Sequence, residues 1–373
     1  MDCRIPQDKI ASHLLNTCSN MEHVSFSHGS TPLDVVEYIQ LPTKQDFYTS
    51  DIKCWSLTYL KLSFTYYTNN DQLTDHDCIH NEQLGRLLSQ CPNLKHLFMD
   101  SGGTIHHGNC LDQILKHCHR LETLVISPNA DFPSDCSDNK HITSTTQRPG
   151  LRQLVLSGKH LRITNTDMIS VYKQHYETLE MIYLYFHSID EITRSLVKLA
   201  HTKAPRLQQL YLLTDNNFIP ISIHKLGYPS INKALVTLLS GGCPLLNTIH
   251  IINNDFDYSM PESKYNGDNY FSISDKVLKA IATGCRELHT LKFPGPRRYT
   301  KKGLMHFATT GVKKLVELEM DIIPEHILEV VIRIESLQKL IFSGSNTSLP
   351  DDIQNALSEI LQKRIGIASH LTE

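Results

Sequence analysis

The sequence lacks a long apolar run and lacks an excess of charge of either sign. No stretch approaches the roughly 20 apolar residues that a membrane-spanning helix needs, and no charged and then apolar leader opens the chain. The 36 Lys and Arg residues nearly balance the 39 Asp and Glu residues. No general attraction to nucleic acid or to an anionic membrane is therefore expected. We expect an intracellular protein, cytoplasmic or nuclear, that binds neither.

The sequence also lacks the short motifs that indicate a catalytic or metal site. It contains no G-x-S-x-G elbow, no G-x-x-x-x-G-K-S/T phosphate loop, no H-E-x-x-H motif and no C-x-x-C pair. The best zinc candidate is the segment His106–Cys110 followed by His117–His119, because imidazole and thiolate are the ligands that zinc prefers. Neighbouring His117 and His119 would point in different directions at a helix end. We therefore predict no metal site, no cofactor and no catalytic residue.

What the sequence does contain is a repeated pattern, C-x-x-L-x-x-L-x-L, in which the Cys is optional. All three apolar positions are filled in eleven copies of the pattern. The first apolar position of each copy lies at residue 21, 57, 94, 121, 151, 179, 207, 246, 288, 315 or 337. With 40% apolar residues, chance would fill one such triple only about 6% of the time. Most of the regular spacings are at or near the 20 to 29 residues of a leucine-rich repeat.

The pattern predicts a short strand, and the apolar spacing before it predicts a helix. In the copy Ile273–Phe293, Val277, Leu278 and Ile281 lie on one helix face. Neither element can bury its apolar face alone, but stacked neighbours cover each other. We predict an α/β fold, a leucine-rich repeat solenoid, built as a right-handed curved stack of about eleven strand-helix repeats with a parallel sheet on its concave face. The solenoid spans residues 1–348, and an apolar stripe predicts a C-terminal capping helix and tail over 349–373.

Six of the ten cysteines occupy one position of the repeat, at the helix end just before the strand. They are Cys18, Cys54, Cys91, Cys118, Cys243 and Cys285. A small, weakly polar thiol packs well beneath a turn. Separations of whole repeats are unlike a disulfide framework, so we interpret these residues as structural free thiols in a reducing compartment.

The same copy resembles the cysteine-containing leucine-rich repeat, whose pattern is I-T-D-x-G-L-x-x-I-A-x-G-C-x-x-L. The matching residues are Ile273-Ser274-Asp275, Val277-Leu278, Ile281-Ala282, Gly284-Cys285 and Leu288, and parts recur at Ile163–Met168, Leu73–Asp75 and Tyr299–Leu304. Such repeats are typical of F-box/leucine-rich repeat proteins, the substrate receptors of SCF-type ubiquitin ligases. The resemblance covers nearly the whole chain and implies a protein substrate as partner.

The F-box itself is absent from this chain, because Ile5–Ile10 leads within a few residues into the first repeat. Either the chain is a fragment or its adapter function lies elsewhere. If an F-box lies upstream, the resemblance implies SCF ubiquitin ligase components as further partners. The alternative is a leucine-rich repeat scaffold or adapter with no ubiquitin-ligase link.

Partner-binding residues are predicted on the concave face, where side chains between the inward leucines point outward. From Phe98 to His250 this column is apolar or aromatic in six successive repeats, and beyond Lys292 it becomes acidic at Glu319. Aromatic anchors are typical of protein interfaces, although such residues also pair across strands. The predicted residues are Phe98, Val125, Val155, Met181, Tyr183, Tyr185, Tyr211, His250 and Lys292. Tyr183 and Tyr211 are expected to be exposed and to carry binding.

A second contact surface is predicted at one edge, where solenoid insertions collect in loops. The longest insertion, residues 253–270, is polar and carries Phe256, Tyr258, Tyr265 and Tyr270. Long loops with aromatic residues on a rigid scaffold are typical contact loops, although most insertions are neutral decoration. The basic run Pro296–Lys302 is expected on the same edge, exposed to solvent.

Overall fold

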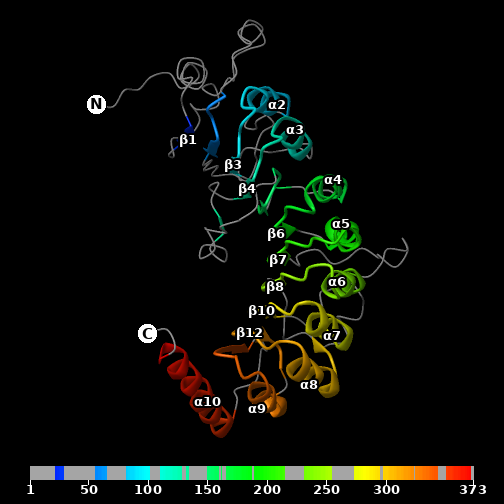
Figure 1. The fold of residues 1–373 in the computed structure, drawn as a ribbon, viewed down its shortest axis with the longest axis vertical. Helices are drawn as coiled ribbons and strands as arrows, with labels where there is room; N and C mark the ends of the chain where they lie inside the picture. Colours follow the sequence, from blue (N-terminus) through cyan, green and yellow to red (C-terminus); the bar gives the residue numbers. More distant parts are fainter. Residues whose placement is uncertain are drawn as a thin grey trace, which may run out of the picture. The chain divides into compact units, whose positions relative to one another are not determined.

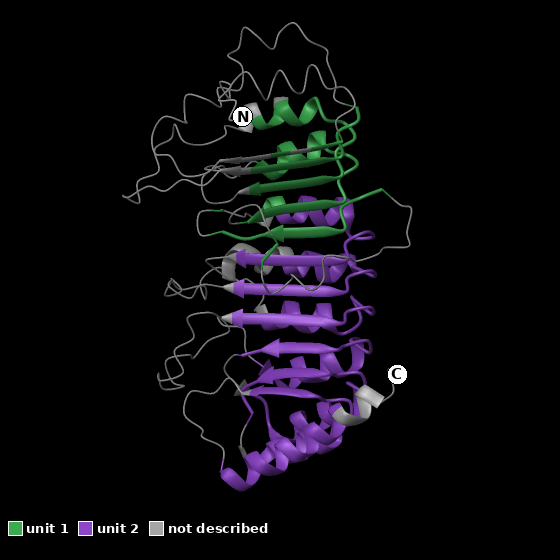
Figure 2. Ribbon diagram, turned by 90° about the vertical axis from the view of Figure 1, so that its left-hand side faces the viewer, with its two compact units in different colours: residues 1–167 green, residues 168–373 purple. Residues whose placement is uncertain are grey.

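Short strands and helices alternate through the computed structural model. It describes residues 22–28, 55–64, 81–100, 110–127, 132–133, 149–158, 161, 165–186, 189–214, 231–253, 273–294, 297–322, 324–342 and 350–370. The chain divides into two compact units, residues 1–167 and 168–373, coloured green and purple in Figure 2. Among the described residues, no helix combines the length and the apolar character that crossing a membrane requires.

The first unit contains a parallel sheet whose strands follow one another in sequence order, β1-β2-β3-β4-β5. The strands are β1 (His23–His28), β2 (Tyr59–Phe64), β3 (His96–Asp100), β4 (Thr123–Ser127) and β5 (Gln153–Leu156). Helix α2 (Asn81–Ser89) precedes β3 and α3 (Cys110–His117) precedes β4. Both helices lie on the same side of the strand layer (Figure 1).

The second unit repeats this arrangement, with strand order β6-β7-β8-β10-β12-β13. These strands are β6 (Met181–Phe186), β7 (Gln209–Thr214), β8 (Thr248–Asn253), β10 (Thr290–Phe293), β12 (Glu317–Met320) and β13 (Lys339–Phe342). The helices are α4 (Asn165–His175), which begins at the unit boundary, α5 (Ile189–Thr202), α6 (Ile231–Leu239), α7 (Asp275–Gly284), α8 (Lys301–Thr310), α9 (Pro324–Arg333) and α10 (Asp351–His370). In this unit the strands line the inner side of a curve and α4 to α9 the outer side (Figure 1).

Strands occupy all eleven predicted sites, which confirms the leucine-rich repeat fold. Their alternation follows the pattern: in β10, Leu291 and Phe293 are buried, whereas Thr290 and Lys292 are partly exposed. Neighbouring repeats place their leucines side by side, as the register of Leu291 with Ile249 and with Leu318 shows. Leu291 is therefore covered by the repeats before and after it, whereas Leu340 in the last strand is half-buried.

The cysteine position is the start of a tight turn between helix and strand. The Leu94, Leu121, Leu246 and Leu288 N–H groups donate to the Cys91, Cys118, Cys243 and Cys285 carbonyls at 3.1 to 3.2 Å. In other repeats the accepting residue is Ala204, Val312 or Ile334, so the turn does not require a thiol. All four cysteines are buried and none forms a disulfide. Burial raises the pKa of Cys118, Cys243 and Cys285 to about 12. The structural interpretation of the cysteines is confirmed for these four; Cys18 and Cys54 lie outside the described residues.

The Ile-Ser/Thr-Asp part of the pattern joins one repeat to the next on the helix side. Ser274 caps α7 by accepting from the Val277 N–H at 3.4 Å. The Asp275 carboxylate then accepts from the Thr300 N–H at 2.7 Å and from the Thr300 hydroxyl at 2.9 Å. A Cβ built on Gly303 would overlap this carboxylate, so the pattern's glycine leaves the room that the contact needs.

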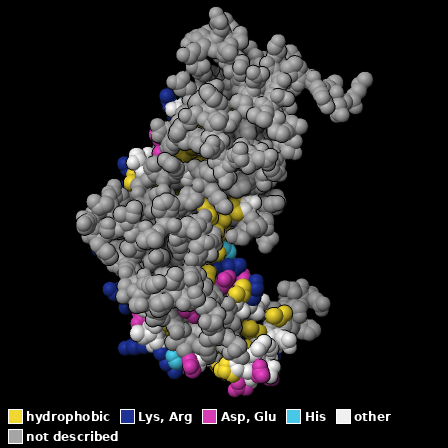
Figure 3. Space-filling view, turned by 180° about the vertical axis from the view of Figure 1, so that it is seen from behind, with side chains coloured by type: hydrophobic (Ala, Val, Ile, Leu, Met, Phe, Trp, Pro, Cys, Tyr) yellow, Lys and Arg dark blue, Asp and Glu magenta, His cyan; other side chains and the backbone are white. Residues whose placement is uncertain are grey.

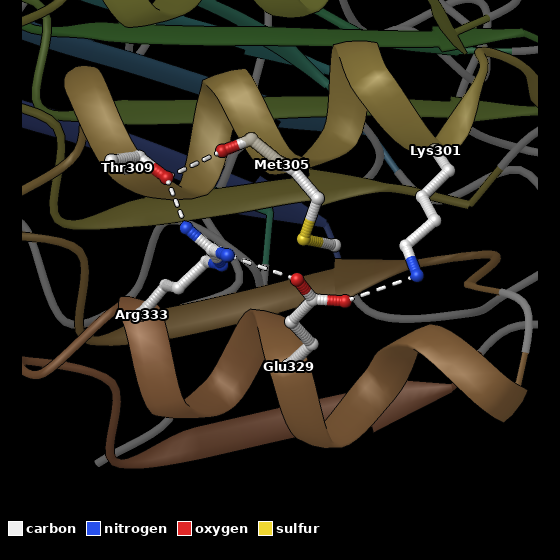
Figure 4. Close-up of polar contacts among 5 residues, drawn as sticks. All are labelled: Lys301, Met305, Thr309, Glu329 and Arg333. Carbon is white, nitrogen blue, oxygen red and sulfur yellow. Dashed lines mark hydrogen bonds and ion pairs between the residues drawn. The ribbon is translucent and has the colours of Figure 1, made fainter.

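A polar seam on the outer surface holds α8 against α9 (Figure 4). Glu329 pairs with Lys301 at 3.3 Å and with Arg333 at 2.9 Å. Arg333 also donates to the Thr309 hydroxyl at 3.0 Å, and that hydroxyl donates to the Met305 carbonyl at 2.7 Å. The expected exposure of the basic run is confirmed at Arg298, Lys301 and Lys302, whereas Tyr299 within it is buried. Arg297–Arg298 also forms strand β11, which pairs with β9 (Ile273–Ser274).

Helix α10 lies against the last repeat. Its Leu357 is buried, and the Arg364 guanidinium donates to the carbonyls of Ile334 at 2.9 Å and Leu337 at 3.3 Å. These contacts agree with a capping role over residues 349–373, and the role itself stays a prediction.

Candidate functional site

The concave face of the second unit has two parts that follow one repeat frame. Because the strands are in register, Tyr183, Tyr211, His250, Lys292, Glu319 and Ile341 form one outward column across the sheet. We call the face of β6, β7 and β8 the closed part and the face of β10, β12 and β13 the open part. The two parts differ in burial and in charge.

The closed part is buried, and the expected exposure of its tyrosines is wrong. Tyr183 is 4% exposed and Tyr211 is 1% exposed, and Met181 is buried beside them. The two rings pack on each other with centroids 5.5 Å apart. Side chains covered to this extent offer almost no surface to a partner, so their geometry supports the alternative that the sequence left open, packing across strands. Tyr185, at the end of β6, is half-buried.

His250 ends the closed part. It is 5% exposed, and its ring meets the Tyr211 ring edge-on at 4.6 Å. Burial lowers the His250 pKa to about 4, and Lys292 lowers it further while Glu317 opposes the shift. At neutral pH the imidazole is therefore uncharged. The His250 side chain lies between the packed tyrosines of the closed part and the charged residues of the open part, and it adds no charge to either.

The open part carries both signs of charge within reach of solvent. The Glu317 carboxylate pairs with Lys339 at 2.8 Å and with Lys292 at 3.4 Å, across the strands on either side. The side chains of Lys339, Lys292 and Glu317 are 60%, 24% and 19% exposed. Figure 3 shows acidic and basic side chains beside a histidine and hydrophobic side chains where one face of the molecule is hollowed.

Glu319 lies at the centre of the open part, between Lys292 on β10 and Ile341 on β13. It is half-buried and has no hydrogen bond or ion pair with any residue that the structure describes. Burial raises the pKa of its carboxyl group, and this effect exceeds the attraction of Lys292. The lysine contacts instead hold the pKa of Glu317 below its usual value, although burial opposes them. Two carboxylates on one strand thus differ in their partners.

In the first unit, the predicted partner-binding residues also differ in how deeply they are buried. Val125 and Val155 are buried. Phe98 is half-buried, and its ring lies 5.1 Å from Tyr59 and, edge-on, 5.7 Å from Phe132, centroid to centroid. The segment after β4 therefore brings Phe132 against the outward side chain of β3, which the repeat pattern does not predict.

The predicted loop-edge residues Phe256, Tyr258, Tyr265 and Tyr270 lie outside the described residues. So do His106 and His107 of the zinc candidate. Cys110 is buried with its pKa raised to about 12, mainly by burial. Within the described part of the chain, no group of three or more His, Cys, Asp or Glu side chains is placed to hold a metal ion.

Two residues of the open part were missed by the predicted list, Glu317 and Lys339. Both belong to the outward column one position before the second inward leucine, in register with Thr290. Apart from Met181 and Tyr185, which flank Tyr183, the predicted list contained only residues of the central column. The charges in the neighbouring column, Glu317 beside Lys339, were a readable signal, because cross-strand neighbours on one face interact.

Comparison with known proteins finds similarity to solved structures only. No protein family matches this chain, and no curated protein matches it. Similar solved structures include a chain of the Rad7 and Elc1 complex in yeast, with 11% identity, a TM-score of 0.45, and coverage of 79% of this chain and 66% of that chain. Another is the leucine-rich repeat-containing protein LegL7 from Legionella pneumophila, with 13% identity, a TM-score of 0.37, and coverage of 91% and 97%. This chain thus spans slightly less than two thirds of the yeast chain. The likeness concerns the fold alone.

Proposed function

We propose that this chain is a protein-binding module whose open part holds a segment of a partner protein. The observation that carries this proposal is the change along one strand layer, from the buried Tyr211 and His250 to the partly exposed, charged Lys292, Glu319 and Lys339. A rigid sheet positions these side chains before binding, which lowers the entropic cost of association. Charged groups of both signs favour a protein partner with complementary charges.

A catalytic function has no comparable support. The buried cysteines Cys91, Cys118, Cys243 and Cys285 are fixed beneath turns, and the last three have a pKa near 12. A thiol with such a pKa supplies almost no thiolate at neutral pH, so it is a poor nucleophile. Their position is explained by packing.

The narrower proposal is that the bound segment belongs to a substrate of an SCF-type, F-box-like ubiquitin ligase. It rests on the resemblance of Ile273–Leu288 to the cysteine-containing repeat, whose serine cap, aspartate bridge and buried cysteine each have a structural role in this chain. Those roles explain the repeat without requiring the ligase. A scaffold that binds a protein without any ligase is the competing function.

Affinity capture of the full chain from cells, followed by mass spectrometry, tests both the general proposal of protein binding and the narrower proposal of a ubiquitin ligase. Under the ligase proposal, a cullin and its adapter are recovered together with a substrate. Under the scaffold alternative, partners are recovered reproducibly but the cullin and adapter are absent. Neither result by itself locates the binding surface.

Charge reversal locates it. The double variant Lys292→Glu, Lys339→Glu turns the open part acidic and should change recovery of a specific partner by about tenfold or more. Lys314→Glu is the matched control, because Lys314 also pairs with a glutamate, Glu287, but at the turn before β12. Lys314→Glu breaks an exposed ion pair and should alter the free energy of unfolding by about 1 kcal/mol or less. The double variant also places like charges beside the partly buried Glu317 and should cost more, so thermal unfolding is used to show that each variant is folded. Equal recovery with both variants would contradict binding at the open part.

A further inference from the structure

The charges of the open part are unevenly paired. Its two lysines, Lys292 and Lys339, both contact the Glu317 carboxylate. Glu319, two residues along the same strand, points to the same face, yet the described residues give it neither an ion pair nor a hydrogen bond. Glu317 is therefore in contact with both lysines, whereas Lys292 and Lys339 attract Glu319 without a described contact.

Among the described residues, no group other than these two lysines brings a positive charge near Glu319. His250, which faces Lys292 from β8, is neutral at physiological pH because burial lowers its pKa. On the other side of Glu319 lies Ile341, a half-buried apolar side chain on β13. Strands in a sheet are roughly 4.8 Å apart, so Ile341 lies one strand from Glu319, whereas His250 lies two strands away, beyond Lys292.

We propose that the open part binds a protein segment that presents an arginine or lysine to Glu319. This inference rests on the proposed function and names the chemistry of its partner. A guanidinium matches a carboxylate through two parallel hydrogen bonds, and its aliphatic stem packs on an apolar side chain such as Ile341. The raised pKa of Glu319 supports the same conclusion, because partial burial without a partner disfavours the charged form and an incoming cation reverses this.

A random peptide library displayed on phage and selected on the immobilised full chain tests the proposal without a known partner. Peptides are kept for analysis only if the Lys292→Glu, Lys339→Glu variant changes their affinity, since this ties them to the open part. We expect these peptides to share an arginine or lysine. Glu319→Gln should weaken their binding by about tenfold, whereas Glu325→Gln, the same change on the exposed start of α9, should not.

A double-mutant cycle identifies the pair directly. Replacing the shared basic residue of a selected peptide by alanine should weaken binding to the unaltered chain and have almost no further effect on Glu319→Gln. Thermal unfolding of each variant shows that the comparison is made between folded proteins.

The outcomes separate the two proposals. If selected peptides respond to the lysine reversals but lack a basic residue, or bind Glu319→Gln as tightly as the unaltered chain, the inference about Glu319 is overturned and the proposed function stands. If no peptide responds to the lysine reversals, the open part is not a protein-binding surface and both proposals are overturned.

Discussion

The closed and open parts of the second unit are built from the same repeat and lie on the same face of one sheet, yet they differ in burial and in charge. In the closed part, outward positions hold Tyr183 and Tyr211, which are buried and pack on each other. In the open part, the same positions hold Lys292 and Glu319, which are partly exposed. The repeat position therefore tells which way a side chain points, but not how exposed that side chain is to solvent. Whether such a residue stabilises the fold or meets a partner depends on what covers it.

The largest expected effect comes from Tyr211→Ala in the closed part. Removing a fully buried aromatic side chain leaves a cavity and should cost about 3 to 5 kcal/mol of unfolding free energy, measured by urea denaturation. Tyr211→Phe retains the ring and should cost far less. A loss below about 1 kcal/mol for Tyr211→Ala would show that the ring is exposed after all, as the sequence suggested.

Strand β10 allows the comparison to be made within one element. Leu291 points inward and is fully buried, so Leu291→Ala should cost about 2 to 5 kcal/mol. The next residue, Lys292, points outward into the open part, and Lys292→Ala should cost about 1 kcal/mol or less because its ion pair is partly exposed. Equal losses in urea denaturation would mean that the inward and outward assignments of this strand are wrong.

Acidification should destabilise the closed part through His250. Its pKa is lowered from 6.5 to about 4 in the folded chain, so the unfolded chain binds the proton first. Stability is therefore complete above pH 6.5 and is lost as the pH falls from 6.5 towards 4, by roughly 2 to 3 kcal/mol.

His175, which burial also shifts to about 4, contributes in the same direction. In His250→Gln, the unfolding free energy measured by urea denaturation should therefore fall less steeply between pH 7 and pH 4 than in the unaltered chain. It should still fall, because His175 remains. An unchanged slope in this variant would show that His250 is accessible to protons without unfolding.

The smallest effect on stability is expected for Glu319→Gln in the open part. Burial already disfavours the charged form of this carboxyl group, so neutralising it should leave the unfolding free energy unchanged or raise it slightly, within about 1 kcal/mol. Glu317→Gln is the informative counterpart, because it removes the partner of two lysines and should destabilise modestly. If Glu319→Gln is the more damaging of the two, Glu319 is part of the packing and not a free binding group.

The sequence predicted the repeat frame because that frame depends on local periodicity. The inward leucines, the helix stripe of Val277 and Ile281, and the cysteine position are each set by which residues a strand or helix can bury. The strand sites could be read from the chain, since a stacked repeat contacts mainly its neighbours. The acidic change beyond Lys292 was readable for the same reason.

Exposure was decided by the tertiary structure. Tyr211 and Lys292 occupy equivalent outward positions, and nothing in the repeat pattern distinguishes a covered position from an open one. Phe132 against Phe98 is a contact between residues of different repeat positions, which periodicity does not encode. The pairing of both lysines with Glu317, and the lack of such a partner at Glu319, likewise depend on cross-strand distances and side-chain rotamers. The sequence by itself determined which way each side chain points, because that follows from the backbone period; what lies over it depends on segments distant in the chain, and only the folded structure brings them together.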